Sequence, residues 1–177
     1  MSRGKIAHAI RPVNPDPQYG SKIISKIVNR LMMSGNKATV LKSMYEGVEK
    51  LKPFIEEKFE EYTQGSVNDY SGADYNKKVV VFFEVLINKI APTIEIRSRR
   101  VGGSNYQIPS PVNPRRSLCL AILWFVKGVR SRKAASLGDK IAAEIKDVFS
   151  GTGESMKKKE MVAKQAEANK AFAHFAN

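Results

Sequence analysis

Apolar residues recur at intervals of three to four along most of this 177-residue chain, and that period restricts it to a largely helical fold. The first such run starts after Ser21, a good N-cap, and stops at Gly35, a common helix terminator. The same reasoning predicts helices over about residues 21–34, 36–52, 75–90, 114–129, 136–149 and 156–175, with a short acidic piece at 54–62. We therefore expect a mainly α fold, a bundle of about six main helices.

One segment breaks the helical period. Polar and apolar residues alternate from Thr93 to Arg99, Gly102-Gly103 follows, and Tyr106–Ile108 resumes a β-rich run. Alternation on both sides of a Gly-Gly turn predicts one β-hairpin, a ribbon over about residues 93–109 that protrudes between the third and fourth main helices. The prolines from Pro109 onward are expected to end it. A two-stranded hairpin is marginal alone in water, so this ribbon should rest on a partner.

Residues 1–20 are expected to form an extended basic arm ahead of a single helical domain at 21–177. Proline denies the backbone its helical donors, and this stretch contains Pro12, Pro15 and Pro17. The arm is either a frayed terminus or a segment that lies along nucleic acid.

The charge of the chain points to a polyanionic partner. Lys and Arg number 30 against 17 Asp and Glu, which gives a net charge of +13. Residues 89–133 alone hold ten of these basic residues and one acid, Glu95. Charge of one sign destabilises a fold unless a counter-charge lies against it, and nucleic-acid phosphate is the natural one. No apolar stretch reaches the roughly 18 residues that span a bilayer, so a membrane is not the expected partner.

A protruding basic ribbon suits an irregular or single-stranded RNA surface, with arginines on phosphates. Tyr106 either stacks on a base or packs against the helical body. A general DNA-binding or nucleoid protein is the alternative, because phosphate attraction does not distinguish the two polymers and a ribbon can enter a DNA groove. The RNA-binding candidates outside the ribbon are Arg3, Lys5, Arg11, Lys22, Arg30, Lys37, Arg115, Arg116, Arg130, Arg132, Lys133, Lys157 and Lys158.

No catalytic or cofactor chemistry is visible in the sequence. The two histidines stand at His8 and His174, and neither has metal-ligand spacing with Cys119, the only cysteine. Cys119 is expected to be a packed thiol on a buried helix. No Walker-type phosphate loop is present. We therefore expect neither an enzyme nor a bound metal or cofactor.

Three stretches resemble the small-subunit ribosomal protein seven family, of the bacterial and organellar type. The first runs from Asp16–Ser21 into Val28–Met32. The second is Val101-Gly102-Gly103-Ser104, set between an arginine-rich strand and Tyr106–Pro109. The third is Ala166–Phe175. The similarity covers nearly the whole chain in order, and the second and third stretches are highly specific.

The resemblance implies a helical body with a protruding ribbon, as the periodicity does. It also implies binding to the 3′ major domain of small-subunit ribosomal RNA, nucleation of the subunit head, and neighbouring head and platform ribosomal proteins. In that family the ribbon points toward the exit-site transfer RNA and the messenger path. By motif, the RNA-binding residues carried over are Arg97, Arg99, Arg100, Gly102, Gly103 and Tyr106 in the ribbon and Arg115 and Arg116 on the following helix. Asn169 and Lys170, with His174, are carried over to a C-terminal segment that contacts RNA or a neighbouring protein.

Two departures from the family pattern stand out. Residues 52–74 are longer and more acidic than the usual connection, which suggests a lineage-specific extension. The chain ends in Phe175-Ala176-Asn177, without the aromatic or basic ending common in bacterial members. That ending favours a ribosome of a mitochondrion or plastid over one of the bacterial cytoplasm.

Overall fold

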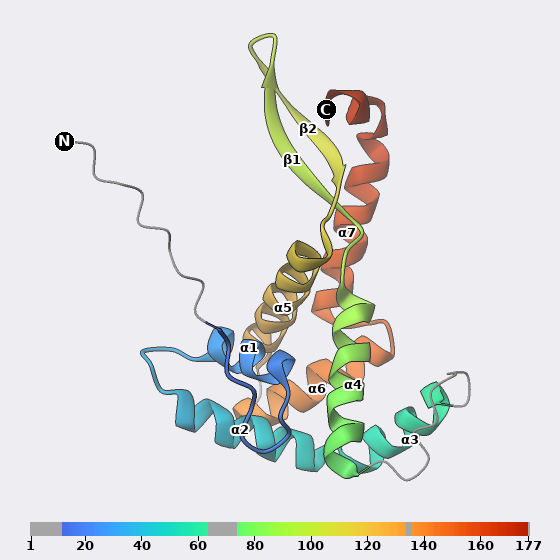
Figure 1. Cartoon of the computed structure of the whole chain (residues 1–177). Coiled ribbons are helices and arrows are strands. Elements are labelled where there is room, and N and C mark those ends of the chain that lie inside the picture. Colours follow the sequence, from blue (N-terminus) through green and yellow to red (C-terminus); the bar gives the residue numbers. More distant parts are fainter. Residues whose placement is uncertain (1–11, 64–73, 134–135, 177) are drawn as a thin grey trace, which may run out of the picture.

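The computed structural model describes residues 12–63, 74–133 and 136–176 and confirms the expected fold class. The prediction of a helical bundle with one ribbon is right, and the acidic piece is a helix of its own, so the ribbon joins α4 to α5 (Figure 1). Arg3, Lys5 and Arg11 lie outside the described residues. The elements are α1 (Lys22–Leu31), α2 (Lys37–Lys50), α3 (Lys52–Thr63), α4 (Tyr75–Ile90), β1 (Ile94–Val101), β2 (Ser104–Pro111), α5 (Pro114–Ser131), α6 (Leu137–Phe149), α7 (Glu154–Ala168) and the 3-10 helix η1 (Lys170–Ala176).

Side-chain caps start three of the helices where the sequence predicts them. Ser21 accepts a hydrogen bond from the Ile24 amide, and Ser136 accepts one from the Asp139 amide at 3.1 Å. Asn113 caps α5, and Pro114 takes its first position, where a missing N–H costs nothing.

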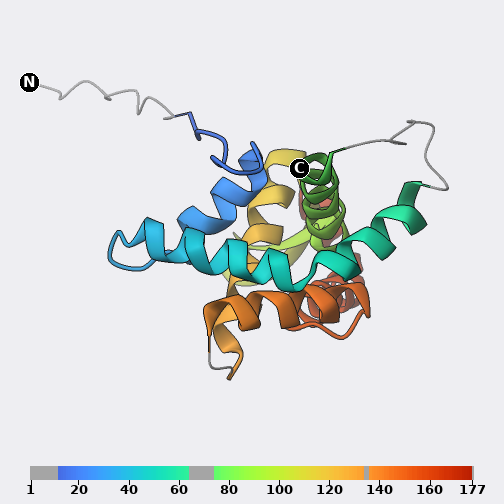
Figure 2. The ribbon, with the colours of Figure 1, turned by 90° about the horizontal axis from the view of Figure 1, so that it is seen from below.

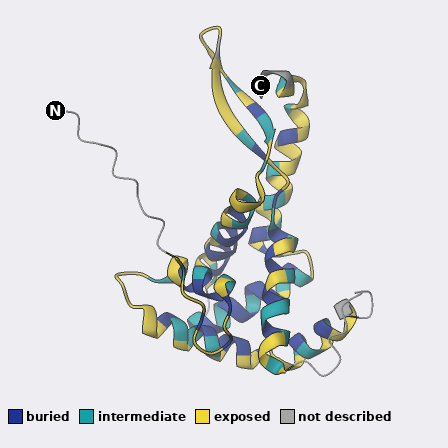
Figure 3. Ribbon diagram, viewed as in Figure 1, coloured by how far each residue is buried: buried dark blue, intermediate teal, exposed yellow. Residues whose placement is uncertain are grey.

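The core lies within the helical body, while most of the ribbon is exposed (Figure 3). Phe83 of α4 and Phe125 of α5 are fully buried. Seen from below, α2 and α6 run side by side (Figure 2). They approach closely because glycines face each other there: a Cβ on Gly47 would lie 3.0 Å from the carbonyl oxygen of Gly138. Among the described residues, no helix is long and apolar enough to cross a membrane.

The ribbon is longer than predicted, because Pro109 and Pro111 lie inside β2 rather than ending it. They pair with Ile96 and Ile94, and the next pair out is hydrogen-bonded through the Val112 amide and the Thr93 carbonyl. Hydrogen-bonded pairs alternate in an antiparallel ladder, so both prolines fall at positions where no ladder donor is needed.

The C-terminal helices flank the ribbon. The end of α7 and η1 run along it, with η1 against β2 (Figure 1). A 3-10 helix rarely exceeds three or four residues, yet η1 has seven. Its contacts with β2 therefore supply stability that its own geometry does not.

The last residues of the predicted arm pack against the helical body, whereas residues 1–11 lie outside the described part of the chain. Asp16 is buried, its carboxylate accepts hydrogen bonds from the Gln18 and Tyr19 amides, and the Tyr45 hydroxyl of α2 donates to it at 2.9 Å. Gly20 follows with a φ of +68°, a conformation that favours glycine. The Asp-Pro-Gln-Tyr-Gly-Ser stretch is thus a turn fastened to the body, not part of an extended arm.

Candidate nucleic-acid interface

The first part of the candidate interface lies between α1 and α5. A hollow of about 350 Å³ is lined by Val13, Lys26, Asn29, Arg30, Cys119 and Ile122. Arg30 was expected here from the sequence. Lys26, one helical turn earlier on the same face of α1 and partly exposed, was not among the predicted binding residues. The expectation for Cys119 was wrong: its thiol is exposed, because it lies beside the buried stripe of α5 and not within it.

The second part is the joint between ribbon and body, built around Glu95. Its carboxylate is nearly buried and accepts a hydrogen bond from Arg97 Nε at 2.6 Å and one from Arg116 Nε at 3.2 Å. Burial raises the pKa of the Glu95 carboxyl, but the hydrogen bonds from the two arginines outweigh it, so the pKa lies below its usual value. Glu95 is therefore a carboxylate anion that links β1 to the start of α5.

The tip of the ribbon carries its other two predicted arginines, Arg99 and Arg100, both exposed. Gly102 and Gly103 form the turn with φ of +60° and +91°, which side chains other than glycine rarely adopt. The glycines thus have a conformational reason for their positions, independent of any RNA contact.

Tyr106 packs within the protein, which was one of its two expected arrangements. Its ring lies 5.2 Å, centroid to centroid, from that of Phe172 in η1. Asn169 ends α7 and hydrogen-bonds the Gln165 carbonyl through its side chain, and Lys170 is exposed beside it. The Ala166–Phe175 motif therefore braces the ribbon.

The remaining predicted cations are spread over the molecule. Arg130 donates to the carbonyls of Arg30 and Leu31, and so caps the end of α1. Arg132 pairs with Glu144 and Asp147. The other predicted cations, all exposed, are Lys22 at the start of α1, Lys37 at the start of α2, Arg115 in the first turn of α5, Lys133 just beyond α5, and Lys157 and Lys158 on α7.

These contacts revise the charge argument. The excess of cations in residues 89–133 was expected to lack an internal counter-charge, but Glu95 faces two of the arginines, and Glu144 with Asp147 faces a third. The excess of cations is therefore reduced but not removed. Among the described residues, no group of three or more His, Cys, Asp or Glu could hold a metal ion.

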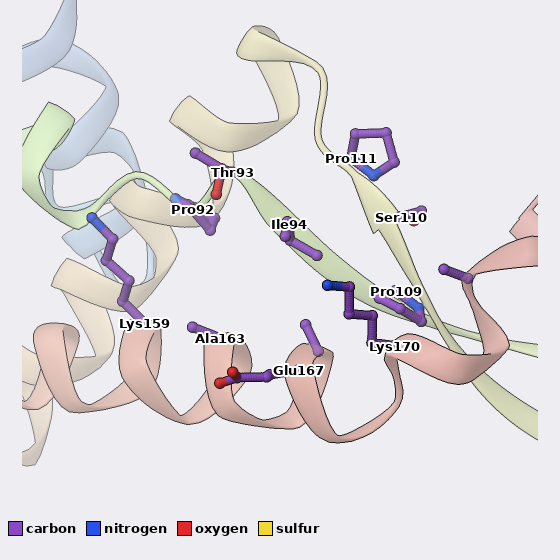
Figure 4. Close-up of a pocket in the computed structure, with 12 residues that line it drawn as sticks. Pro92, Thr93, Ile94, Pro109, Ser110, Pro111, Lys159, Ala163, Glu167 and Lys170 are labelled. Carbon is purple, nitrogen blue, oxygen red and sulfur yellow. The ribbon is translucent and has the colours of Figure 1, made fainter.

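An apolar groove of about 450 Å³ separates the ribbon base from α7 and η1 (Figure 4). Pro92, Ile94, Pro109 and Pro111 line it on the ribbon side, opposite alanines of α7 and η1. Ile94 is 43% exposed in this groove, although it is a large apolar residue.

Comparison with known proteins identifies the family of the chain. Residues 2–170 match the sequence model of the family described as ribosomal protein S7p/S5e. The chain belongs to the ribosomal protein S7p/S5e family. Curated members of the S7p/S5e family that resemble it include the small ribosomal subunit protein uS7 of Francisella tularensis subsp. novicida and that of subsp. tularensis. Each is 38% identical over 165 residues, which cover 93% of this chain and 93% of the relative. The resemblance read from the three motifs is thereby confirmed.

Proposed function

We propose that the chain is a structural protein of the small ribosomal subunit that binds ribosomal RNA and has no catalytic role. The observation that carries this proposal is the match to a ribosomal protein family over residues 2–170, in a chain whose α1, start of α5 and ribbon all carry exposed arginines: Arg30, Arg115, Arg116, Arg99 and Arg100. Exposed cations on several separate elements suit an extended phosphate backbone better than a small ligand.

The finer assignments rest on the family resemblance. They are binding to the 3′ major domain, nucleation of head assembly, and a ribbon beside the exit-site transfer RNA and the messenger path. The projecting ribbon supports the last of these, because its tip can reach beyond the body. The apolar groove of Figure 4 supports contacts with neighbouring head and platform proteins, since its lining offers few hydrogen bonds to a nucleotide base.

The compartment is part of the same proposal. The relatives named above are bacterial and give no support to an organellar origin, which rests only on the C-terminal ending. A ribosomal location is common to both cases. Co-sedimentation of the native protein with small subunits would support it, whereas a stable pool of unattached protein would contradict it.

The direct test is binding of a 3′ major-domain RNA fragment at several salt concentrations. Replacing Arg99 and Arg100 with Ala should weaken binding and reduce the slope of log affinity against log salt by about one for each lost phosphate contact. The Lys42→Ala, Lys77→Ala double variant removes the same charge at exposed positions outside the candidate interface and serves as the control. Equal slopes for the two double variants would contradict the assignment of the ribbon, and tighter binding to duplex DNA at matched salt would favour a DNA-binding protein.

A further inference from the structure

Glu95 uses both carboxylate oxygens to join two cations from different elements. Arg97 lies two residues further along β1 and contacts Oε1, while Arg116 comes from the first turn of α5 and contacts Oε2. The Glu95 side chain is 11% exposed, so the ion pairs are shielded on the carboxylate side. The two guanidinium groups are therefore held at one point, where the ribbon leaves the body.

The opposite sides of the two arginines face solvent. The side chain of Arg97 is 66% exposed and that of Arg116 is 57% exposed, although both are ion-paired. A guanidinium has five N–H donors, and Glu95 engages only the minority of them. The group of three keeps a net positive charge, so it can still attract an anion.

We propose that Glu95 is a positioning residue that holds Arg97 and Arg116 as a two-pronged clamp for one backbone phosphate of RNA. This inference rests on the proposed RNA-binding function and assigns a site within it. A phosphodiester has two unesterified oxygens, one for each guanidinium. Arginine loses considerable side-chain freedom when it binds, and Glu95 removes part of that cost before RNA arrives.

For the variant Glu95→Gln, the clamp and the net charge predict opposite changes in RNA affinity. Glu95→Gln makes the protein one unit more positive, so simple attraction predicts tighter RNA binding. If Glu95 positions the arginines, the same change weakens binding, by about five- to tenfold. Glu167→Gln is the matched control, because Glu167 is exposed, lies across the groove from the ribbon base, and undergoes the same charge change (Figure 4). This control should bind RNA as tightly as the unaltered protein or more tightly.

A double-mutant cycle separates positioning from a general effect on the fold. In an Arg97→Ala, Arg116→Ala background, Glu95→Gln should cause no further weakening, because the groups through which it acts are gone. An equal loss in both backgrounds would overturn the clamp. Circular dichroism and thermal unfolding establish that each variant is folded. Should Glu95→Gln fail to fold, Arg116→Lys is the alternative variant, because it keeps the positive charge but removes the planar guanidinium with its several donors. Arg116→Lys should weaken RNA binding, and an unchanged affinity would overturn the clamp.

The failures of the two proposals are distinguishable. If the unaltered protein ignores the ribosomal RNA fragment at moderate salt, the proposed function itself fails. If it binds, but Glu95→Gln binds as tightly as Glu167→Gln, only the clamp is wrong.

Discussion

Replacing Gly128 with Ala should destabilise the protein, although Ala normally favours a helix. A Cβ at Gly128 would lie 2.5 Å from Glu144 Oε1 and 2.7 Å from Glu144 Cδ, well inside contact distance. The carboxylate is at the end of a flexible side chain, but it has little room to move. It is fully buried, accepts hydrogen bonds from Ser155 and from Arg132 Nε at 2.8 Å, and lies close to Gly153.

The magnitude follows from what a shift of Glu144 would break. Removing the partner of a buried charge costs about 3–5 kcal/mol. Ala recovers about 1 kcal/mol of helix propensity over Gly. The net loss in the free energy of unfolding should be about 2–4 kcal/mol, which for a chain of this size lowers Tm by roughly 4–16 °C.

Thermal and urea unfolding followed by circular dichroism measure this loss. The informative comparison is Gly128→Ala in a Glu144→Ala background, where the clash is absent and the change should be neutral or slightly stabilising. The reasoning is refuted if Gly128→Ala melts at or above the temperature of the unaltered protein, or if its cost is the same in both backgrounds.

Three further predictions concern other parts of the molecule. Burial, with help from nearby groups, raises the pKa of Tyr19 and of Tyr45 to about 12, above the ordinary 10. Their stabilisation is complete below pH 10 and lost between pH 10 and 12, so alkaline unfolding and tyrosinate absorbance should rise together in that window, and early ionisation would contradict the buried turn. Maleimide should label Cys119 readily, and the ribosomal RNA fragment should slow the reaction; an unchanged rate would remove the α1–α5 face from the interface. Phe172→Ala should cost about 1 kcal/mol locally and speed amide exchange in β2 about fivefold with little change in Tm, whereas equal acceleration in α5 would indicate global loosening instead.

The helices and the ribbon were predictable because local chemistry specifies them. Ser21, Asn113 and Ser136 cap helices wherever they precede an apolar run of the right period, whatever the rest of the chain does. The Gly102-Gly103 turn similarly fixes the ribbon, because it supplies two consecutive positive φ values. The end of the ribbon was misplaced because the effect of a proline depends on which side of the strand its nitrogen faces, and only the pairing register determines that.

The parts of the interface that sequence reasoning missed depend on contacts between distant residues. Glu95 and Arg116 are 21 positions apart, and Glu144 reaches both backward to Arg132 and forward to Ser155. One signal was present in the sequence. Glu95 is the single acidic residue among ten basic ones in residues 89–133, which indicates an ion-pair partner for nearby arginines. Cys119 was misjudged for a related reason, since an apolar neighbourhood in sequence does not say on which side of the helix a residue lies.

The packing of η1 against β2 means that the ribbon is synthesised before the segment that supports it. The ribbon is complete at Pro111, whereas η1 begins at Lys170, about 60 residues later. At a synthesis rate of about 5–20 residues per second, several seconds pass before the growing polypeptide reaches η1. During that interval one flank of β2 is uncovered, and any chain that terminates before Lys170 keeps it so. A nonsense change near the C-terminus would thus impair an element encoded far upstream while leaving the helical body able to fold.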